Sequence, residues 1–363
     1  MFDAADREFM GRALGLARRG LYTTTPNPRV GAVVVRDGTV VGEGWHEKAG
    51  LAHAEVIALA QAGGRARGAT LYLNLEPCSH HGRTPPCADA VIAAGVARVV
   101  AAMQDPNPEV SGAGFAKLRA AGIRVEIGLM EDEAHELNVG FVSRMTRGRP
   151  WVRMKIAASL DGRTALANGK SQWITGPAAR RDGHAWRARA CAVLTGIGTV
   201  KDDDPRLTVR EVETPRQPLK VLIDSKLEVD PGARLFEGGN ALVVAARDDP
   251  AKASALRARG AEVICIPNAQ GKTELMSVMR ELGRRGVNEL HVEAGTRLNG
   301  SLLREDCVDE LLVYLAPGVI GDTGRGMFAL PELVSLEDRI ALDFSGVERV
   351  GDDLRLIARV RRD

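Results

Sequence analysis

Four residues in the first quarter of the chain have the types and spacing of a catalytic zinc site. His53 and Glu55 are two positions apart, Cys78 follows Leu-Glu-Pro, and Cys87 comes after an insert of eight residues. One imidazole and two thiolates can fill three corners of a tetrahedral Zn²⁺ site and leave the fourth for water. A carboxylate beside that water can move protons. The group therefore has the equipment for hydrolytic removal of an amino group from a nucleobase-like ring.

The expected secondary structure brings these four residues together. Helical composition over 53–62 places the histidine and the glutamate in the first turn of one helix. Pro85 and Pro86 favour the start of a second helix that runs to Gly95, and the two cysteines lie at or before that start. Two helix N-termini directed at one point would lower the thiol pKa and favour thiolate, the form that binds zinc.

A closed zinc site that only stabilises the fold is the alternative. It needs a fourth protein ligand, and His80 or His81 in the insert could supply one. A lone His-x-Glu is common, but His-Ala-Glu followed by a strand ending in Glu-Pro-Cys and a later cysteine is specific. We therefore interpret the site as catalytic, with His80 and His81 lining the pocket or solvated. His46 and His135 are interpreted as ordinary surface or satisfied residues.

Length and composition define the setting of this site. At 363 residues the chain is too long for one ordinary core, so two domains are expected. The 49 basic and 47 acidic residues nearly cancel, which gives no strong field for nucleic acid or a membrane. No signal-peptide pattern opens the chain and no apolar run approaches the roughly 20 residues of a membrane span, so the cytoplasm is the expected location. Cys191, Cys265 and Cys307 stand in or beside apolar runs and are predicted core residues.

Strands and helices alternate along the chain, which predicts two α/β domains. In the first, residues 1–146, Asp3 or Asp6 can cap a helix that ends at Gly20, and Asp37-Gly38 suits a tight hairpin turn. The other elements predicted there are strands at 30–35, 39–41, 69–74, 98–102 and 123–127, and helices at 53–62, 85–95, 114–121 and 131–144.

Residues 145–150 have the composition of a domain boundary, so a second domain is predicted over 147–363. No Gly-x-Gly-x-x-Gly follows an early strand, and a Rossmann dinucleotide site is therefore not predicted. The stretch from His291 to Ser301 reads as a strand, a glycine turn and a helix start, and that helix start could instead cradle a pyrophosphate. The predicted strands lie at 151–157, 192–195, 219–224, 241–245, 262–266, 289–293, 311–315, 340–344 and 354–360, and the helices at 177–190, 251–259, 272–284 and 296–304.

The first half resembles a known family. TPNPRVGAVVV, HAEVIAL and LNLEPCSHHGRTPPC are similar to the deaminase half of the bifunctional riboflavin-biosynthesis deaminase/reductases. That half has the three-layer α/β/α fold of the cytidine-deaminase-like zinc superfamily, and the insert departs from the P-C-x-x-C spacing of nucleic-acid deaminases. The resemblance implies His53, Cys78 and Cys87 as zinc ligands, Glu55 as the proton shuttle, Asn27 at the ribose end of the pocket and Arg83 near the substrate phosphate. A Pro-Asn-Pro turn also gives Asn27 the plainer role of a turn former.

The second half resembles the reductase half of the same family through VRMKIAASLDGRTA, SQWITG, GTVKDDDPRLTVR, VLIDS and VEAG, in this order. That half has a dihydrofolate-reductase-like α/β fold and uses NADPH. The resemblance implies NADPH contacts at Ala157, Trp173, Thr199, Asp203, Ser225, Gly295, Thr296, Arg297, Leu298, Asn299, Gly300 and Ser301. It implies substrate contacts at Ser171, Arg187, Leu207, Arg210 and Glu293, with Lys155 a candidate for polarising the sugar end. Guanidinium forks match phosphate oxygens, which suits the two arginines.

Three of these residues have plainer interpretations. Asp203 could belong only to an acidic helix end or loop, Trp173 could be a core anchor, and Ser171 could cap a local turn.

The resemblance implies a phosphorylated pyrimidine as small-molecule substrate, 2,5-diamino-6-ribosylamino-4(3H)-pyrimidinone 5′-phosphate. Zinc-dependent deamination and NADPH-dependent reduction of its ribosyl group would give 5-amino-6-(5-phosphoribitylamino)uracil. One zinc ion per chain, a homodimer through the reductase domains, and no nucleic-acid or membrane partner are expected. Two alternatives stay open: a deaminase of nucleic-acid bases, which the charge and the cysteine spacing oppose, and a non-catalytic zinc protein that binds a ligand or partner.

Overall fold

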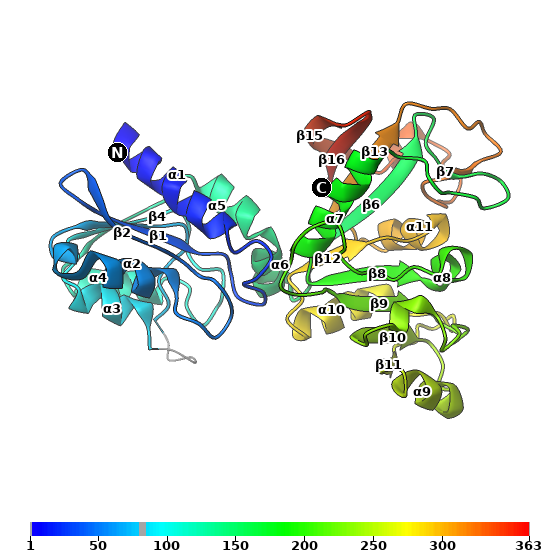
Figure 1. Ribbon diagram of the computed structural model, residues 1–363, viewed down its shortest axis with the longest axis horizontal. Coiled ribbons are helices and arrows are strands. Elements are labelled where there is room, and N and C mark those ends of the chain that lie inside the picture. Colours follow the sequence, from blue (N-terminus) through cyan, green and yellow to red (C-terminus); the bar gives the residue numbers. More distant parts are fainter. Residues whose placement is uncertain (1, 80–84, 363) are drawn as a thin grey trace. The chain divides into compact units, whose positions relative to one another are not determined.

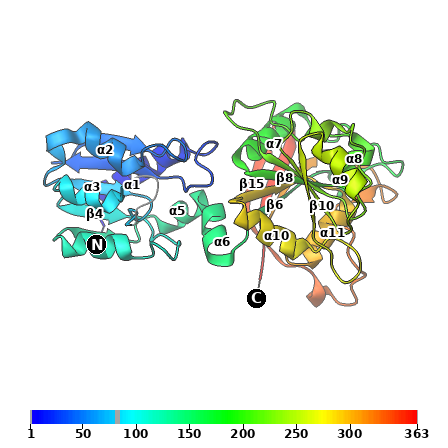
Figure 2. The same cartoon turned by 90° about the horizontal axis from the view of Figure 1, so that it is seen from below.

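A five-stranded mixed sheet in the order β2-β1-β3-β4-β5 forms the centre of residues 1–148 in the computed structural model, which describes residues 2–79 and 85–362. β1 is antiparallel to β2 and β3, whereas β3, β4 and β5 are parallel. Figures 1 and 2 show α1 on one face of the sheet and α2 and α3 on the other. This is the three-layer α/β/α arrangement that the sequence predicts.

The elements of this first unit follow the predicted order. The strands are β1 Gly31–Arg36, β2 Thr39–Trp45, β3 Thr70–Leu73, β4 Arg98–Ala101 and β5 Arg124–Ile127. The helices are α1 Ala4–Arg18, α2 Ala54–Ala62, α3 Cys87–Ala93, α4 Ala113–Ala120, α5 Glu131–Leu137 and α6 Val139–Arg147, with a 3₁₀ turn at Gly63–Ala66. Asp3 caps α1 together with Asp6, and the hairpin turn at Asp37-Gly38 has positive φ at both residues, as predicted.

The single helix predicted at 131–144 is wrong, because Asn138 interrupts it. The backbone of Asn138 departs from helical geometry, and its side-chain amide pairs with both backbone groups of Arg29, at 2.8 and 3.0 Å. α6 then continues to Arg147 and ends at Gly148, whose φ of 66° favours glycine. Part of the linker predicted at 145–150 is therefore helical.

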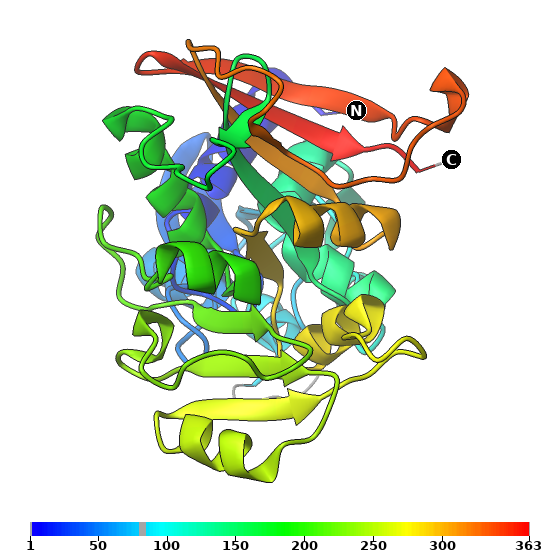
Figure 3. The ribbon, with the colours of Figure 1, turned by 90° about the vertical axis from the view of Figure 1, so that its right-hand side faces the viewer.

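A nine-stranded sheet forms the centre of the second unit, residues 149–363, in the order β11-β10-β9-β8-β12-β6-β13-β16-β15. Strands from β11 to β13 are parallel, and β16 and β15 add an antiparallel end, as predicted. Figure 3 shows this stack, from yellow β11 at one end to red β15 and β16 at the other. A separate two-stranded ribbon pairs β7 with β14.

The strands of this unit are β6 Trp151–Ser159, β7 Arg163–Ala165, β8 Ala192–Gly196, β9 Leu219–Ile223, β10 Ala241–Ala245, β11 Ala261–Cys265, β12 Glu289–Val292, β13 Glu310–Ala316, β14 Arg325–Gly326, β15 Leu342–Val350 and β16 Asp353–Val360. The helices are α7 Pro177–Arg189, α8 Ile197–Asp203, α9 Pro250–Arg257, α10 Leu275–Arg284 and α11 Thr296–Arg304, with 3₁₀ turns at Arg234–Phe236 and Leu336–Asp338. The sequence did not indicate β7, β14 or α8, which are short. The strand predicted at 340–344 begins two residues before β15 and ends six residues before β15 does.

The two faces of the nine-stranded sheet differ in polarity at strands β6 and β12. Met154, Leu290 and Val292 belong to a large apolar core together with residues of α10 and α11. On the opposite face, under α7, the alternate residues of the same strands are polar or charged, among them Arg153 and His291, both buried. Buried charges on this part of the sheet need partners, and a polar site can form there.

Two further observations concern cysteines and membranes. Cys307 is buried and Cys191 is partly buried, but Cys265 is exposed, so its prediction as a core residue is wrong. It ends β11, the edge strand of the sheet, where one side has no neighbour. In the part of the chain that the structure describes, no helix has both the length and the apolar character needed to cross a membrane.

Candidate active sites

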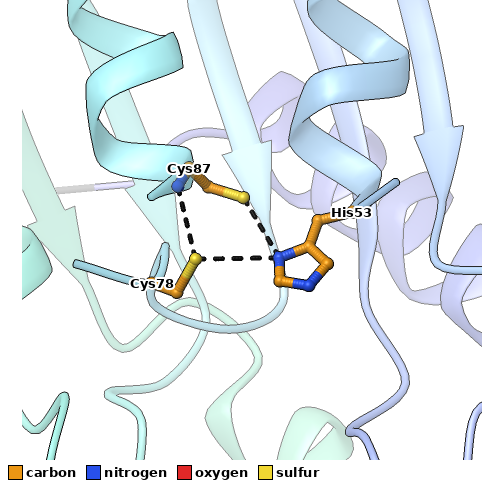
Figure 4. A group of neighbouring side chains, drawn as sticks. All are labelled: His53, Cys78 and Cys87. Atoms are coloured by element: carbon orange, nitrogen blue, oxygen red, sulfur yellow. Dashed lines mark hydrogen bonds between the residues drawn. The ribbon is translucent and has the colours of Figure 1, made fainter. Parts of the chain in front are cut away.

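Three side chains from the first unit meet at one point, as Figure 4 shows. Nδ1 of His53 lies 3.2 Å from Sγ of Cys87 and 3.7 Å from Sγ of Cys78, and the three atoms lie within 4.8 Å of one another. One nitrogen and two sulfurs are a donor set that Zn²⁺ takes in catalytic sites, where the fourth position stays open. Residues 2–79 and 85–362 add no fourth His, Cys, Asp or Glu to the group, while His80, His81 and Arg83 lie outside the described residues.

Helix α2 brings His53 to this point because it packs closely on β2. The strand has glycine at 42 and 44, and Cβ atoms there would lie 2.1 Å and 2.4 Å from carbonyl oxygens of Ala58 and Ala54. Any larger residue would push the helix away from the sheet. His53 is the N-cap of α2 with extended backbone, so its imidazole lies at the helix start beside the cysteines.

Backbone hydrogen bonds fix the two cysteines around the start of α3. Cys87 is the first residue of α3, and its N–H donates to Sγ of Cys78 at 3.3 Å. The N–H of Ala88 donates to the Cys78 carbonyl oxygen at 3.1 Å. The buried carboxylate of Glu76, two residues earlier, accepts four backbone N–H bonds of 2.9 to 3.2 Å from residues in 105–115. The loop that carries Cys78 is thus anchored to the start of α4, an interaction that the sequence did not reveal.

Contacts within the group separate the pKa values of the two thiols. Hydrogen bonds from Cys87 and His53 outweigh burial and lower the pKa of Cys78 to about 4. Cys87 has its pKa raised, because it donates to Cys78 and is itself buried, and the contact with Cys78 also raises the pKa of His53. One sulfur is therefore a thiolate at neutral pH, and metal binding would release the proton of the other.

Glu55 lies beside the three metal-binding atoms and interacts with all three residues. It is 3% exposed, and its Oε2 has no hydrogen-bond partner within the described residues. Burial raises its pKa to about 7. A buried, unsatisfied carboxyl oxygen that titrates near neutrality suits a proton shuttle. The residues present therefore fit a zinc ion with an adjacent general base.

Asn27 and His46 extend this site beyond the metal-binding group. Nδ2 of Asn27 lies 3.1 Å from Nε2 of His46, and the His46 ring stands edge-on to His53 with 5.1 Å between ring centres. Both ring nitrogens of His46 have a hydrogen-bond partner, since Nδ1 also contacts the Ala52 carbonyl oxygen at 3.1 Å. His46 is buried and adjoins the site, so it is not a surface residue. No motif links His46 to His53, so only the fold shows their contact.

A second cluster of charged side chains lies where β12 ends under α7. Arg187 of α7 pairs with Glu293 through Nε and Nη2, at 2.7 and 2.8 Å, and its Nη1 donates to the Thr208 carbonyl oxygen at 2.6 Å. Lys155 on the adjacent strand β6 interacts electrostatically with both members of the pair. These three residues are among those predicted for the substrate, and the fold brings them together.

Electrostatics keep the carboxylate of this cluster ionised. Burial opposes ionisation of Glu293, but Arg187 and His291 hold its pKa well below the usual range. Burial lowers the pKa of Lys155. Nε2 of the buried His291 lies 3.4 Å from Oε1 of Glu293. The sequence interpretation gave His291 no role, although it lies two residues before Glu293, and residues two apart in extended chain point to the same side.

The residues predicted to contact NADPH occupy several segments of this unit. Oγ1 of Thr199 lies 3.7 Å from where a Cβ on Gly295 would stand, so the first turn of α8 and the N-cap of α11 are neighbours. Oγ of Ser171 lies 3.5 Å from Oδ1 of Asp203, which is the last residue of α8, so the acidic run is a helix end. Ser225 exchanges hydrogen bonds of 3.0 Å with Thr273.

Two further parts of the prediction have a definite structural outcome. Trp173 is 70% exposed with the guanidinium of Arg180 4.6 Å from its ring centre, so the core-anchor interpretation is wrong. Asn299 and Gly300 are buried on the inner face of α11, where a Cβ on Gly300 would lie 2.1 Å from the Ala329 carbonyl oxygen. That close packing explains the glycine without a ligand.

Comparisons with known proteins agree with both sites. Residues 3–103 match the cytidine and deoxycytidylate deaminase zinc-binding region, and residues 150–356 match the RibD C-terminal domain. The riboflavin biosynthesis protein RibD of Escherichia coli is 48% identical over 97% of this chain and 98% of its own length. The chain belongs to the RibD family. The solved structure of Acinetobacter baumannii RibD, form 1, is 41% identical and superposes with a TM-score of 0.91 over 99% of each chain.

A third relative carries both activities in its name. The Thermotoga maritima diaminohydroxyphosphoribosylaminopyrimidine deaminase/5-amino-6-(5-phosphoribosylamino)uracil reductase is 34% identical, with a TM-score of 0.86 over 98% of this chain and 99% of that one. As a RibD, the present chain is a bifunctional deaminase and reductase of riboflavin biosynthesis. Its cofactors are zinc, for which the His/Cys/Cys group fits, and NADPH in the second unit.

Proposed function

We propose that this protein deaminates 2,5-diamino-6-ribosylamino-4(3H)-pyrimidinone 5′-phosphate and then reduces the ribosyl group of the product to a ribityl chain. The observation that carries the proposal is the convergence of His53, Cys78 and Cys87 within 4.8 Å beside the buried Glu55. The name of the Thermotoga maritima relative supports the substrate, and the charged cluster of the second unit supports the second step.

In the first unit we assign His53, Cys78 and Cys87 as the zinc ligands and Glu55 as the general base. When bound, zinc acts as a Lewis acid and makes water acidic enough to lose a proton near neutral pH. Glu55 would take that proton and deliver it to a ring nitrogen. It would then take the second proton from the hydroxyl added to the ring carbon and pass it to the departing amine. The ring carbon exchanges its amino group for the water oxygen, and ammonia leaves. Asn27, fixed by His46, would contact the ribose end of the substrate; the role of Arg83 at the phosphate stays a prediction.

In the second unit we assign the substrate to Ser171, Lys155, Arg187, Leu207, Arg210 and Glu293. NADPH would supply a hydride to C1′. When the sugar ring opens, the N–H proton moves to the ring oxygen and leaves a C1′=N bond, so the hydride would be balanced by a proton on that nitrogen. Arg187, Arg210 and Lys155 act electrostatically on His184 together with a single carboxylate, Glu293, so positive groups are in excess there, which suits a 5′-phosphate. We assign NADPH binding to Ala157, Trp173, Thr199, Asp203, Ser225 and the turn at 295–301. Within that turn, residues 295–298 are the better contacts because they are exposed or half-buried, whereas Asn299 and Gly300 are buried.

We also propose that the deaminase comprises residues 1–146 and the reductase residues 147–363, with the division near Gly148, where the two structural units separate. The absence of a disulfide among the five cysteines accords with a cytoplasmic location.

For the homodimer we propose β15 as the contact surface. It is the edge strand of the nine-stranded sheet, and Leu342, Phe344 and Val347 on it are 37%, 68% and 59% exposed. An edge with open hydrogen-bonding groups and exposed apolar side chains suits pairing with a second copy. Sedimentation of Phe344→Asp tests this: the variant should sediment as a monomer at concentrations where the natural sequence is dimeric.

A coupled assay on the diamino substrate tests the proposed function. Ammonia and NADP⁺ are scored separately, with zinc and NADPH each supplied or withheld. We expect release of ammonia to require zinc but not NADPH. We expect formation of NADP⁺ to require NADPH and, in addition, either zinc or the previously deaminated compound as substrate. Release of ammonia from single-stranded RNA but not from the pyrimidine phosphate would replace this proposal with a nucleic-acid deaminase.

A further inference from the structure

The segment 207–210 runs beside helix α7 and is held at three consecutive residues. The carbonyl oxygen of Thr208 accepts from Arg187 at 2.6 Å. Both backbone groups of Val209 bond to the side-chain amide of Gln217, at 2.8 and 3.1 Å. The backbone N–H of Arg210 donates to Nδ1 of His184 at 3.3 Å. A segment without regular secondary structure is thus ordered by side chains from outside it.

His184 lies on α7 three residues before Arg187, so the two side chains occupy the same face of the helix. It is 9% exposed. Arg187 holds the segment at residue 208 and His184 holds it at residue 210. The helix that binds Glu293 therefore also sets the path of the chain that carries Arg210.

The hydrogen bond determines the protonation state of His184. Nδ1 accepts from a backbone N–H, so it carries no proton, and the ring is neutral with its hydrogen on Nε2. Burial lowers the pKa of His184 to about 4, and the positive charges of Arg187, Arg210 and Lys155 act in the same direction, while Glu293 opposes them. The imidazole therefore stays an acceptor for the Arg210 backbone throughout the neutral pH range.

The side chain of Arg210 depends on this backbone. Its guanidinium folds back over the segment, where Nη1 donates to the hydroxyl and the carbonyl oxygen of Thr208 at 3.1 and 3.4 Å. A shift at residue 210 would move the charged group relative to Arg187, Lys155 and Glu293, the other charges that act on His184. A mispositioned guanidinium loses the orientation that phosphate binding needs.

We propose that His184 is a positioning residue of the reductase site: its neutral imidazole fixes the backbone of Arg210 and thereby aims that guanidinium at the anionic group of the substrate. The inference rests on the proposed function, which gives Arg210 its role at the phosphate.

The test compares substitutions of His184 in the full-length, zinc-loaded protein, with NADPH and the deaminated ribosyl phosphate. His184→Leu fills the space of the imidazole but offers no hydrogen-bond acceptor. We expect the KM for the deaminated ribosyl phosphate to rise about tenfold, while kcat and the KM for NADPH change less than twofold. In His184→Asn the amide oxygen can stand where Nδ1 stands, and we expect most of the loss to be recovered. Arg181→Ala, on the exposed face of the same helix, is the matched control and should leave both KM values unchanged.

A double-mutant cycle with Arg210→Ala separates positioning from a general effect on folding. If His184 acts through the Arg210 side chain, His184→Leu should cost nothing further once that side chain is removed. Additive losses, or an equal rise in the KM for NADPH, would overturn the inference. If His184→Leu does not fold, His184→Ala takes its place in the same cycle. If the natural sequence binds NADPH but does not reduce the deaminated ribosyl phosphate, the proposed function itself is wrong. That outcome differs from a failure of the role proposed for His184 alone.

Discussion

The guanidinium of Arg187 and the carboxylate of Glu293 meet edge to edge, with Nε and Nη2 at 2.7 and 2.8 Å from the two oxygens. Arg187 belongs to helix α7 and Glu293 follows strand β12, so the pair joins a helix to the sheet. Both side chains are mostly buried, at 12% and 19% exposed. The pair is therefore part of the structure of the reductase site as well as of its electrostatics.

Replacement of Arg187 by alanine should affect substrate binding and stability together. We expect the KM for the substrate to rise at least tenfold and the KM for NADPH to change little, because the guanidinium lies among the residues proposed to contact the substrate. The variant leaves a buried carboxylate without its partner, which costs about 3 kcal/mol of unfolding free energy. Steady-state kinetics and urea unfolding measure the two effects. Adding Glu293→Gln should restore stability but not activity; a raised NADPH constant alone would contradict the assignment.

Glu55→Gln should separate the two activities. The amide cannot accept a proton from water, and general-base catalysis contributes about 10² to 10⁴-fold, so ammonia release should fall below detection. Zinc content should stay the same, since the metal-binding atoms belong to other residues. NADPH oxidation with the deaminated substrate should survive. Loss of both activities from a folded, zinc-loaded variant would break the two-site interpretation.

Cys87→Ser should lose zinc where Cys265→Ser does not. A serine hydroxyl replaces a thiolate ligand, and we expect at least a tenfold loss in zinc affinity, measured by competition with a chromogenic chelator. Cys265 is exposed at the end of β11 and serves as the control for removal of one thiol. Equal zinc affinity in both variants would show that the metal binds elsewhere.

The sequence predicts the fold well where local signals decide it. Alternating strands and helices, the cap at Asp3 and the turn at Asp37-Gly38 depend on nearby residues, and the structure confirms all three. The break at Asn138 depends on Arg29, 109 residues away in the chain, and no local pattern contains it. Cys265 is exposed because β11 lies at the edge of the sheet. The order of the strands determines that position, and no local sequence pattern contains it.

The two sites differ in how far the sequence predicts them. His53, Cys78 and Cys87 form a motif whose residue types are dictated by zinc chemistry, so their convergence could be expected before the fold was seen. His46 and His184 act through other side chains, and such supporting contacts have no fixed spacing. His291 could have been found, because it lies two residues before Glu293 in extended chain and so points to the same side.

A division near Gly148 should give two fragments that fold separately. Residues 1–148 and 149–363 each form a compact unit with its own sheet and core. We expect the first fragment to be soluble and to release ammonia when zinc is present, and the second to bind NADPH. Circular dichroism and zinc analysis measure the outcome. An insoluble first fragment would move the boundary beyond Gly148, because α6 would then need residues of the second unit.

In the fragment 1–148, Asp6→Asn should reveal a stabilising pair that depends on pH. Asp6 is buried and accepts from Arg98 at 2.7 and 3.0 Å and from Tyr72 at 2.8 Å, which joins α1 to β3 and β4. The hydrogen bond from Arg98 lowers its pKa from 3.8 to about 2. A lowered carboxyl pKa adds stability above pH 3.8, and that stability is lost as the pH falls towards 2.

We expect Asp6→Asn to lower the unfolding free energy by about 1 kcal/mol at pH 7, since solvent at the partly exposed Arg98 screens the pair. At pH 2 urea unfolding should find little difference between the two proteins. An equal loss at both pH values would mean that the side chain contributes through shape and not through its charge.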